Sequence, residues 1–581
     1  MPIKILFFVF VLLSSIVVPW SQSVADDVTS QKILDELDLS RSDIRLYKKI
    51  FQNIKNSQFE LIDKQIKNLD NKFLLGHVLA EKYLSKQYKS TPQELEQWLK
   101  EYSDLPQKNR IHKLALRKKT QDIPKAKKDT KPIDTFSMYN WPNKDFKHLS
   151  NANRIFLHKQ VKSFKQAIRK GKTKRARLIL ENKSVKKLLP KKYYASLALT
   201  LATKYLTDGQ NRLALQWGQI SAQKQATASA YWTAGIAAWQ LKHYKTAASQ
   251  FKKVSASSNN DEWISSAGDF WTARSYSKQK NNTQTMKWLK KSATYKRTFY
   301  GILAAYKLGE MPDYNWSKIA YFNDFQTQKS LDFLLGSKRL KRILGLIFIK
   351  QEELVNSELK SAAGELNNAQ KEAILYLANY YQLHSISILL SQELCDDNEN
   401  RSYDHSFYPL PDWEPQSGWK TDKALVWALS RQESSFRPYI MSPAGACGLM
   451  QLLPSTAAYI SGNKKLRKNQ QKLFQIQYNL ELGQDYVSYL MEKPFINGNL
   501  LYMLTAYNAG PGNLSKWLKN IKDNNDPLLF MEIVPSRETR IYMERVMANY
   551  WIYQIRMGQT TSTLKQLSED KWPVLSKKKS L

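Results

Sequence analysis

A short pattern that returns after 39 residues is the feature that most constrains the fold. The sequence YWTA at 231–234 recurs as FWTA at 270–273, and each copy precedes a second stretch rich in lysine and aromatic residues. A repeat of this length is the size of a helix pair, and stacked helix pairs form an α-solenoid. Helical periodicity extends almost throughout the chain from Asp26, and no convincing run alternates as a strand does. We therefore predict an all-α fold.

Short helices with short connections are expected before the repeat. Ser40 or Ser42 can cap a helix that runs through Ile50, and apolar periodicity predicts further helices over 74–86 and 92–101.

Two later stretches carry less regular signals. Residues 110–131 are charged, uneven and interrupted by Pro124, so we expect an exposed loop or a frayed helix pair there. Gly309 provides a C-cap signal for the last helix of the repeat region, and another helix is expected over 369–390. An acidic, Asn-containing run and a proline-rich stretch then mark a domain boundary near Asp404.

The first 25 residues have the parts of a secretory signal peptide. Lys4 provides the positive charge, an apolar run follows, and residues 23–25 form a small-x-small cleavage site. The apolar run is shorter than the ~20 residues of a spanning helix, which favours cleavage over an uncleaved anchor. We expect a periplasmic protein without a stable membrane anchor.

The charge balance favours a polyanionic partner. Lys and Arg number 89 against 51 Asp and Glu, a formal net charge of +38. This excess suits nucleic acid, an acidic membrane surface or an anionic polymer of the cell envelope, and export argues against nucleic acid. The alternative of a generally basic surface with no particular partner remains open.

Cys395 and Cys447 do not make a disulfide framework, and we expect no bond between them.

One carboxylate near the C-terminus is placed for acid–base chemistry. Leu425, Leu429 and Glu433 follow at i, i+4 and i+8, so a helix puts them on one otherwise apolar face. Desolvation there would raise the pKa of the carboxyl group and keep it protonated near neutral pH. The alternative is a helix-end Glu that faces solvent or pairs with Arg431 or Arg437.

Three further motifs follow along the chain. A glycine-containing turn at 442–448 allows the backbone to approach a ligand closely. Tyr507 and Asn508 stand at a helix end, and Glu538 and Tyr542 are spaced i, i+4 at a helix start. Taken singly, each is also explained by an ordinary turn, cap or surface residue.

Together and in order, these segments resemble the motifs of the soluble lytic transglycosylases, murein-cleaving enzymes with a goose-lysozyme-like catalytic domain. The matching segments are ALSRQESSF, SPAGACGLMQLLPSTA, LTAYNAGPGN and VPSRETRIYMERV. Residues 104–106 and the stretch FYGILAAYKLG resemble the superhelical part of the long members. The resemblance implies a ring-like α-superhelical solenoid, a helical linker domain and a lysozyme-like domain. The domains expected are a signal peptide at 1–25, the α-superhelical U-shaped domain at 26–314, the linker domain at 315–403 and the catalytic domain at 404–581.

The resemblance also implies roles for individual residues. Glu433 would be the single catalytic acid and base. Residues expected to bind or position the glycan are Ser442, Met450, Gln451, Tyr507, Asn508, Glu538 and Tyr542. Cys447 stands where the family commonly has serine, and Leu453 where methionine is frequent. Both changes bear on the shape or the redox sensitivity of the groove.

The expected mechanism needs one carboxyl group where ordinary glycosidases need two. No Asp or Glu lies between Glu433 and Glu481, although Glu481, Asp485 or Glu538 could fold back toward Glu433. A charged Glu538 nearby would raise the pKa of Glu433. The resemblance implies that Glu433 protonates the leaving oxygen and then deprotonates the 6-hydroxyl of the sugar, while the 2-acetamido group stabilises the intermediate.

We therefore expect an exported lytic murein transglycosylase, a lyase that cleaves the MurNAc-β-1,4-GlcNAc bond and forms 1,6-anhydro-MurNAc ends. Its partner would be peptidoglycan glycan strands and not nucleic acid, and we expect no cofactor and no metal, because the seven histidines form no HExxH or Cys/His cluster. A lysozyme-like hydrolase of the same bond and a non-catalytic murein-binding scaffold are the alternatives. Exo- or endo-action and protein partners in wall synthesis or division do not follow from the sequence.

Overall fold

The computed structural model describes residues 31–118, 146, 148–259, 261–317, 335–362, 364–395 and 402–575. The signal peptide expected at 1–25 lies outside these residues. In the described part, the regular elements are helices, and the paired extended residues are isolated bridges. The all-α prediction is confirmed. None of the described helices is both long enough and apolar enough to cross a membrane.

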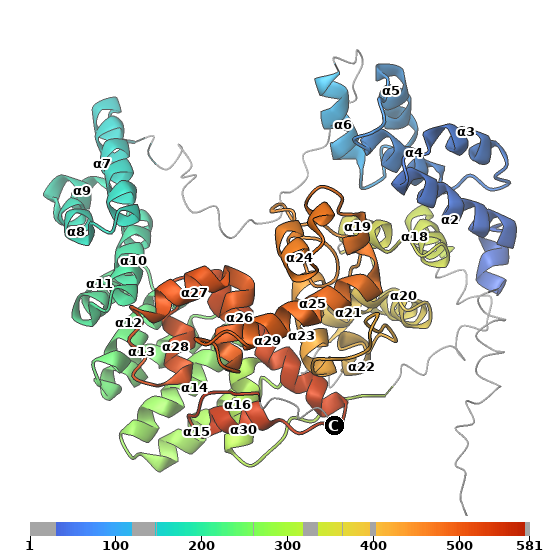
Figure 1. Ribbon diagram of the computed structural model, residues 1–581. Helices are drawn as coiled ribbons and strands as arrows, with labels where there is room; N and C mark the ends of the chain where they lie inside the picture. Colours follow the sequence, from blue (N-terminus) through green and yellow to red (C-terminus); the bar gives the residue numbers. More distant parts are fainter. Residues whose placement is uncertain are drawn as a thin grey trace, which may run out of the picture. The chain divides into compact units, whose positions relative to one another are not determined.

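The chain divides into two compact units, and each contains two separate segments of sequence (Figure 1). The first unit comprises Met1–Lys131 and Asn315–Pro409, and the second comprises Pro132–Tyr314 and Leu410–Leu581. The domain boundaries expected from the sequence stay a prediction.

The first unit joins the N-terminal helices to those that follow residue 335. Its helices are α2 (Arg41–Lys55), α3 (Phe59–Lys67), α4 (Leu75–Leu84), α5 (Pro92–Glu101), α6 (Lys108–Arg117), α18 (Lys338–Phe348), α19 (Glu352–Ser361), α20 (Asn368–Tyr380), α21 (His384–Leu394) and α22 (Asp404–Phe407). One apolar core contains Ile50 and Val78 from the first segment and Ile343 and Leu375 from the second. Because burial of apolar surface is the main favourable term in folding, the two segments stabilise each other.

A buried ion-pair network also joins these segments. Oε1 of Glu358 lies 3.0 Å from Nε2 of His77 and 2.7 Å from Nε of Arg342. Arg342 also pairs with Asp104 at 2.7 Å. Since the side chains of His77 and Glu358 are fully buried, each depends on its partners to offset the loss of hydration.

Most helix predictions for this unit are confirmed. Oγ of Ser40 accepts a hydrogen bond from the backbone N–H of Asp43 and caps α2. The helix expected over 92–101 is α5, which Thr91 and Glu94 start with a reciprocal capping box.

Two predictions for this unit need correction. In the stretch 110–131, residues up to Arg117 belong to the ordered helix α6, which packs through the buried Ile111 and Ala115; residues from 119 lie outside the described part. The helix expected over 369–390 is two helices, α20 and α21, because Gln382 takes a left-handed conformation with φ 57° between them.

The second unit begins with the helical repeat. Its first helices are α7 (Asn151–Arg169), α8 (Thr173–Glu181), α9 (Lys183–Leu188), α10 (Lys191–Thr207), α11 (Asn211–Lys224), α12 (Ala228–Gln240), α13 (Tyr244–Ala256), α14 (Glu262–Lys278), α15 (Asn282–Ala293) and α16 (Phe299–Lys307). From α10 to α16, each helix packs on the next (Figure 1). The rings of Trp232 and Trp271 lie 6.2 Å apart, and both contact Phe251 of the helix between them. The predicted helix-pair repeat is confirmed, and Gly309, with φ 80°, follows its last helix.

The C-terminal segment completes this unit. Its helices are α23 (Lys423–Ser434), α24 (Pro454–Ile460), η4 (Lys464–Arg467), η5 (Gln471–Phe474), α25 (Ile476–Met491), α26 (Leu500–Ala509), α27 (Pro511–Leu518), α28 (Pro527–Ile533), α29 (Arg537–Arg556) and α30 (Ser562–Ser568). Helices α23 and α29 pack against each other, and α29 also contacts α16. Trp551 of α29 stacks on Phe299 at 5.0 Å, and Arg274 of α14 pairs with Asp526 and Asp570. The repeat therefore packs against α29 and supports it through α16.

Candidate active site

Glu433 lies in the last turn of α23. Asp422 starts this helix by accepting a hydrogen bond from the backbone N–H of Ala424, and Leu425 and Leu429 are fully buried. The helix ends at Ser434 because the next two residues, Ser435 and Phe436, are left-handed, with φ 52° and 60°. The early end places the carboxyl group where the chain turns away from the helix.

Two neighbours and burial set the protonation of Glu433. The side chain is half-buried, and its Oε1 accepts a hydrogen bond of 2.7 Å from the hydroxyl of Tyr542. Burial is the main cause that raises the pKa of Glu433 to about 7; the Tyr542 hydrogen bond acts against this rise, and the charge of Glu538 adds to it. At neutral pH the group is therefore shared between its acid and its carboxylate form.

Tyr542 and Tyr507 form a stacked pair beside the acid. Their ring centroids lie 6.5 Å apart with an interplanar angle of 12°. The hydroxyl of Tyr507 donates to the backbone carbonyl of Met450 at 2.8 Å. Burial raises the pKa of both tyrosines well above its ordinary value, so both hydroxyls stay protonated donors near neutral pH.

The glycine-containing turn is held by its own side chains. Oγ of Ser442 accepts from the backbone N–H of Ala446 at 3.0 Å, and Nε2 of Gln451 donates to the carbonyl of Gly448 at 2.8 Å. Gly448 has φ 78°, and a Cβ there would lie 2.3 Å from the carbonyl oxygen of Leu473. This position requires glycine for both its conformation and its space.

Met450 contributes to the site through the hydrogen bonds of its backbone, while its side chain is packed in the core. The residue is fully buried, and a Cβ at Gly483 of α25 would lie 2.0 Å from its sulfur. Its carbonyl accepts from Tyr507, and its N–H donates to Oδ1 of Asn479 at 2.8 Å. Met450 therefore links the turn to α25 and α26.

Asn479 is a residue that sequence reasoning missed. In addition to its bond with Met450, its Nδ2 donates to the carbonyls of Cys447 and Leu473 at 3.1 and 2.7 Å. This one buried amide therefore ties the end of the turn at Cys447 and the nearby Met450 to η5 at Leu473. No sequence pattern could have found it, because its partners are set only by the tertiary fold.

Asn508 and Glu538 lie beside this cluster in different environments. Oδ1 of Asn508 accepts from the hydroxyl of Thr539 at 2.7 Å, which ties the end of α26 to the start of α29. Glu538 is exposed in the first turn of α29, and Ser536 caps this helix. Glu538 acts on Glu433 through its charge.

A row of tyrosine rings extends from the acid to the surface. Beyond Tyr507, the ring of Tyr486 lies at 5.2 Å, that of Tyr489 at 6.3 Å from Tyr486, and that of Tyr459 at 5.4 Å from Tyr489. Tyr459 is 64% exposed. The sequence analysis did not single out these three residues, although Tyr486 and Tyr489 share a face of α25 at i, i+3.

The other candidate carboxylates are engaged elsewhere. Glu481 and Asp485 both form ion pairs with Nζ of Lys420, and Glu481 also accepts from the backbone N–H of Ser417. Burial alone would raise the pKa of Glu481, but the hydrogen bond from Lys420 leaves it below its usual value. Their contacts hold the segment before α23 against α25, and they do not supply a second carboxylate to Glu433.

The remaining predictions concern cysteine and metal chemistry. Cys447 is a buried free thiol whose pKa burial raises, and it donates to the carbonyl of Gly445 at 3.4 Å. In the described residues, no group of three or more His, Cys, Asp or Glu side chains could hold a metal ion.

The arrangement fits general acid and base catalysis by one group. A carboxyl group whose pKa lies near the working pH can donate a proton in one step and accept one in the next. Tyr542 stabilises its carboxylate form, while burial stabilises its acid form.

Residues 414–530 match the family described as the transglycosylase SLT domain. The chain is 28% identical over 286 residues to the soluble lytic murein transglycosylase of Salmonella typhimurium, covering 48% of this chain and 41% of that protein. It is 27% identical over 270 residues to the protein of the same name from Escherichia coli, covering 45% of this chain and 40% of that protein. The matched region thus spans about two fifths of these relatives.

Solved structures resemble most of the chain. The 70 kDa soluble lytic transglycosylase of Escherichia coli has a TM-score of 0.53 and 17% identity, covering 94% of this chain and all of the other. Its complex with bulgecin A has a TM-score of 0.57 and 17% identity, covering 96% of this chain and 93% of the other. An inactive mutant of the lytic transglycosylase Slt from Pseudomonas aeruginosa has a TM-score of 0.55 and 18% identity, with coverages of 92% and 98%. At these identities the likeness is one of fold.

Proposed function

We propose that this chain, whose residues 414–530 match the transglycosylase SLT domain, is a murein lytic transglycosylase. It would cleave the β-1,4 bond between N-acetylmuramic acid and N-acetylglucosamine and leave 1,6-anhydro-MurNAc ends. The observation that carries the proposal is Glu433, whose pKa is raised to about 7 and whose Oε1 is held by Tyr542. The names of the relatives in the matched region point to the same activity.

In the first step, the protonated Glu433 gives its proton to the glycosidic oxygen. The bond between this oxygen and C1 of MurNAc breaks, and its electron pair leaves with the GlcNAc oxygen. The 2-acetamido group stabilises the positive charge that develops at C1. Tyr542 stabilises the carboxylate that Glu433 becomes, since a hydrogen bond to a charged group is stronger than a neutral one.

In the second step, the same carboxylate takes the proton of the 6-hydroxyl group. The oxygen of this hydroxyl then forms a bond with C1 and closes the 1,6-anhydro ring. Glu433 returns to its protonated form, and no water is consumed. A pKa near neutrality suits a group that must act in both directions.

The surrounding residues hold this acid and its substrate. We assign Ser442, Gln451 and Met450 to the shape of the turn, because their hydrogen bonds fix its backbone. Tyr507 links this turn to α26, and Asn508 links α26 to α29. The tyrosine row that ends at Tyr459 provides aromatic faces for the sugar rings of a glycan strand.

The first residues of the sequence support a proposal for the compartment. Residues 1–25 have the pattern of a cleaved signal peptide, and we propose export to the periplasm, where murein lies. The net charge of +38 suits a polymer that carries lactyl and peptide carboxylates.

Mass spectrometry of the products released from purified murein tests the proposal. We expect fragments that end in 1,6-anhydro-MurNAc. Fragments heavier by one water, with reducing ends, would instead identify a lysozyme-like hydrolase. The absence of any released fragment would favour a murein-binding scaffold.

A further inference from the structure

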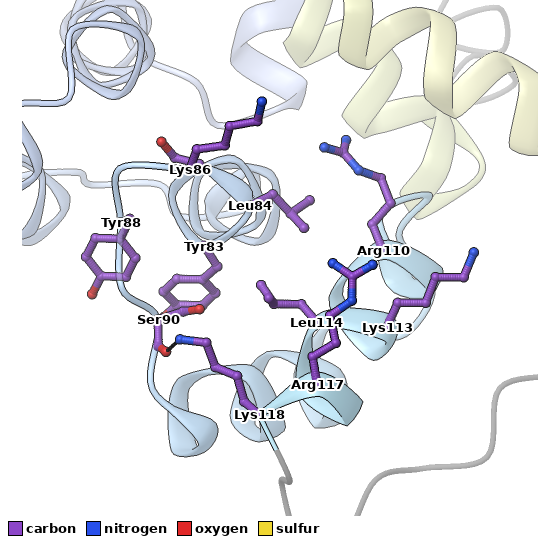
Figure 2. A pocket seen from close by; sticks show the side chains of 11 residues that line it. Tyr83, Leu84, Lys86, Tyr88, Ser90, Arg110, Lys113, Leu114, Arg117 and Lys118 are labelled. Carbon is purple, nitrogen blue, oxygen red and sulfur yellow. Dashed lines mark hydrogen bonds between the residues drawn. The ribbon is translucent and has the colours of Figure 1, made fainter. Parts of the chain in front are cut away.

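A basic cavity lies in the first compact unit and shares no residue with the proposed active site. It has a volume of about 430 Å³ and is formed by the end of α4, the loop to α5, and α6 (Figure 2). Lys86 lines it from the loop, and Arg110, Lys113 and Arg117 line it from α6. Among the described residues that line the cavity, none is acidic. The cavity therefore concentrates positive charge in a concave surface.

The helical spacing of α6 explains how the cations come together. Arg110, Lys113, Leu114 and Arg117 follow at i, i+3, i+4 and i+7, so they share one face. The adjoining face, with Ile111, is the one that packs on the core. Like charges at these spacings repel one another, and an anionic ligand would relieve the repulsion.

Two carboxylates near this cavity are engaged by other groups. Glu94 accepts from the hydroxyl of Tyr88 at 2.5 Å and from the backbone N–H of Thr91. Burial raises the pKa of Glu81, and the charge of Arg110 lowers it, so Arg110 is partly offset. The exposed Lys86, Lys113 and Arg117 carry the remaining excess.

The interior of the cavity is aromatic and apolar. The rings of Tyr83 and Tyr88 are stacked with centroids 6.0 Å apart, and Leu84 and Leu114 line the cavity beside them. Figure 2 shows the side chain of Leu114 extending from α6 toward Tyr83, with Arg117 on the same helix. An apolar body with charged ends fits this combination better than a bare inorganic ion does.

We propose that this cavity binds the carboxylate-bearing peptide stems of murein. The cations from Arg110 to Arg117 extend over two turns of α6, roughly 10 Å at 1.5 Å per residue. A phosphate group cannot contact all of them, whereas a short peptide with several separated carboxylates can. Arg117 provides the planar donor pair that binds a carboxylate through two hydrogen bonds. The choice of ligand rests on the proposed function, because murein is the polymer that carries these peptides.

The test measures binding of a sugar-free murein tetrapeptide to the full chain by isothermal titration calorimetry. The variant Lys113→Glu/Arg117→Glu reverses two exposed charges of the cavity. The matched control Lys49→Glu/Lys67→Glu makes the same change of charge at exposed sites on α2 and α3 of the same unit. We expect the cavity variant to weaken binding at least ~10-fold, the control to bind as the unchanged chain does, and added salt to weaken binding.

Two further ligands identify the group that is recognised. The same tetrapeptide with its carboxylates amidated should bind at least ~10-fold more weakly, and inorganic phosphate should not displace the free peptide. Equal binding by the cavity variant, no binding of the free peptide, or displacement by phosphate would each overturn the inference.

Failure of this inference and failure of the proposed function are separable. The peptide carries no glycosidic bond, so its binding is measured independently of cleavage. Anhydro products without peptide binding would remove the inference and leave the proposed function. Peptide binding that depends on Lys113 and Arg117 would support the inference even if the products had reducing ends.

Discussion

Tyr542 donates its hydroxyl to Oε1 of Glu433 across 2.7 Å, although 109 residues separate them in the sequence. The contact joins the end of α23 to the first half of α29. It lowers the pKa of the carboxyl group while burial raises it, and the balance lies at about 7. The protonation of the proposed acid therefore depends on how closely these two helices pack.

Replacing Glu433 with Gln should abolish cleavage without unfolding the chain. The amide cannot donate and then accept the proton that the two steps require, so we expect a loss of at least ~10²-fold. The measurement is the rate of release of soluble fragments from purified murein. Circular dichroism and sedimentation with insoluble murein serve as controls for folding and binding. A variant that cleaves at the rate of the unchanged chain would remove Glu433 from the mechanism.

The variant Tyr542→Phe should move the pH profile of cleavage upward. Loss of the Tyr542 hydroxyl removes a hydrogen bond that stabilises the carboxylate form of Glu433, so the pKa of Glu433 rises above about 7. The first step needs the protonated acid, and activity falls as pH rises through this pKa. We therefore expect the alkaline limb of kcat against pH to shift to higher pH. Tyr486→Phe is the matched control, and an equal shift in that variant would argue against a specific role for Tyr542.

The variant Glu538→Gln should move the same limb in the opposite direction. The negative charge of Glu538 raises the pKa of Glu433, and its removal lowers that pKa. The effect should shrink in high salt, because salt screens the charge of an exposed side chain. Glu492→Gln, an exposed carboxylate elsewhere in the C-terminal segment, is the control. A profile unchanged at low salt would contradict the prediction.

The buried position of Glu433 should also have a cost for stability. Its pKa is about 7 in the folded chain and 4.5 as the ordinary value, so between these pH values the unfolded chain binds fewer protons. Stability therefore falls as pH rises through this window, by at most about 3 kcal/mol. Glu433→Gln lacks this dependence. We expect its free energy of unfolding in urea, relative to the unchanged chain, to increase between pH 4.5 and 8. A difference that stays constant over this range would exclude the buried, protonated state.

The tyrosine row should contribute to binding of the glycan and not to the chemical step. Tyr459→Ala removes its exposed end, which lies far enough along the row to leave Glu433 and Tyr542 unchanged. We expect KM for soluble glycan strands to rise about 5- to 10-fold with kcat nearly constant. Tyr380→Ala, an exposed tyrosine of the first unit, is the control. A fall in kcat with unchanged KM would contradict this role.

Local sequence signals predicted much of the fold because they act over one or two helical turns. The cap at Ser40, the helix over 92–101 and the pattern shared by Trp232 and Trp271 depend on neighbours within a helix or a helix pair. The desolvated position of Glu433 was also predictable from the sequence, because its helical face is apolar over the two preceding turns, at Leu425 and Leu429. These are the features for which periodicity carries information.

Contacts set by the tertiary fold could not be predicted from local sequence patterns. The left-handed end of α23 at Phe436 is imposed by packing, since this buried ring lies against Trp427 at 5.8 Å and Tyr553 at 6.5 Å. The backbone bonds of Asn479 and the ion pairs of Lys420 likewise join segments that are far apart in the chain. No local pattern distinguishes these residues from ordinary surface asparagine and lysine.

The interleaving of the two compact units limits the order in which the chain can assemble. The buried His77 meets its partner Glu358 only after 281 further residues, so the first unit cannot complete its core from the N-terminal helices alone. The packing of the repeat helices is likewise complete only when α29 is present, because α16 packs against α29. Contacts between residues so far apart in the sequence slow folding. The chain loses conformational entropy when it closes the long loop, before the contacts can stabilise it. During synthesis from the N-terminus, both units would thus be incomplete at the same time, and the last helices to be made would complete the site that contains Glu433.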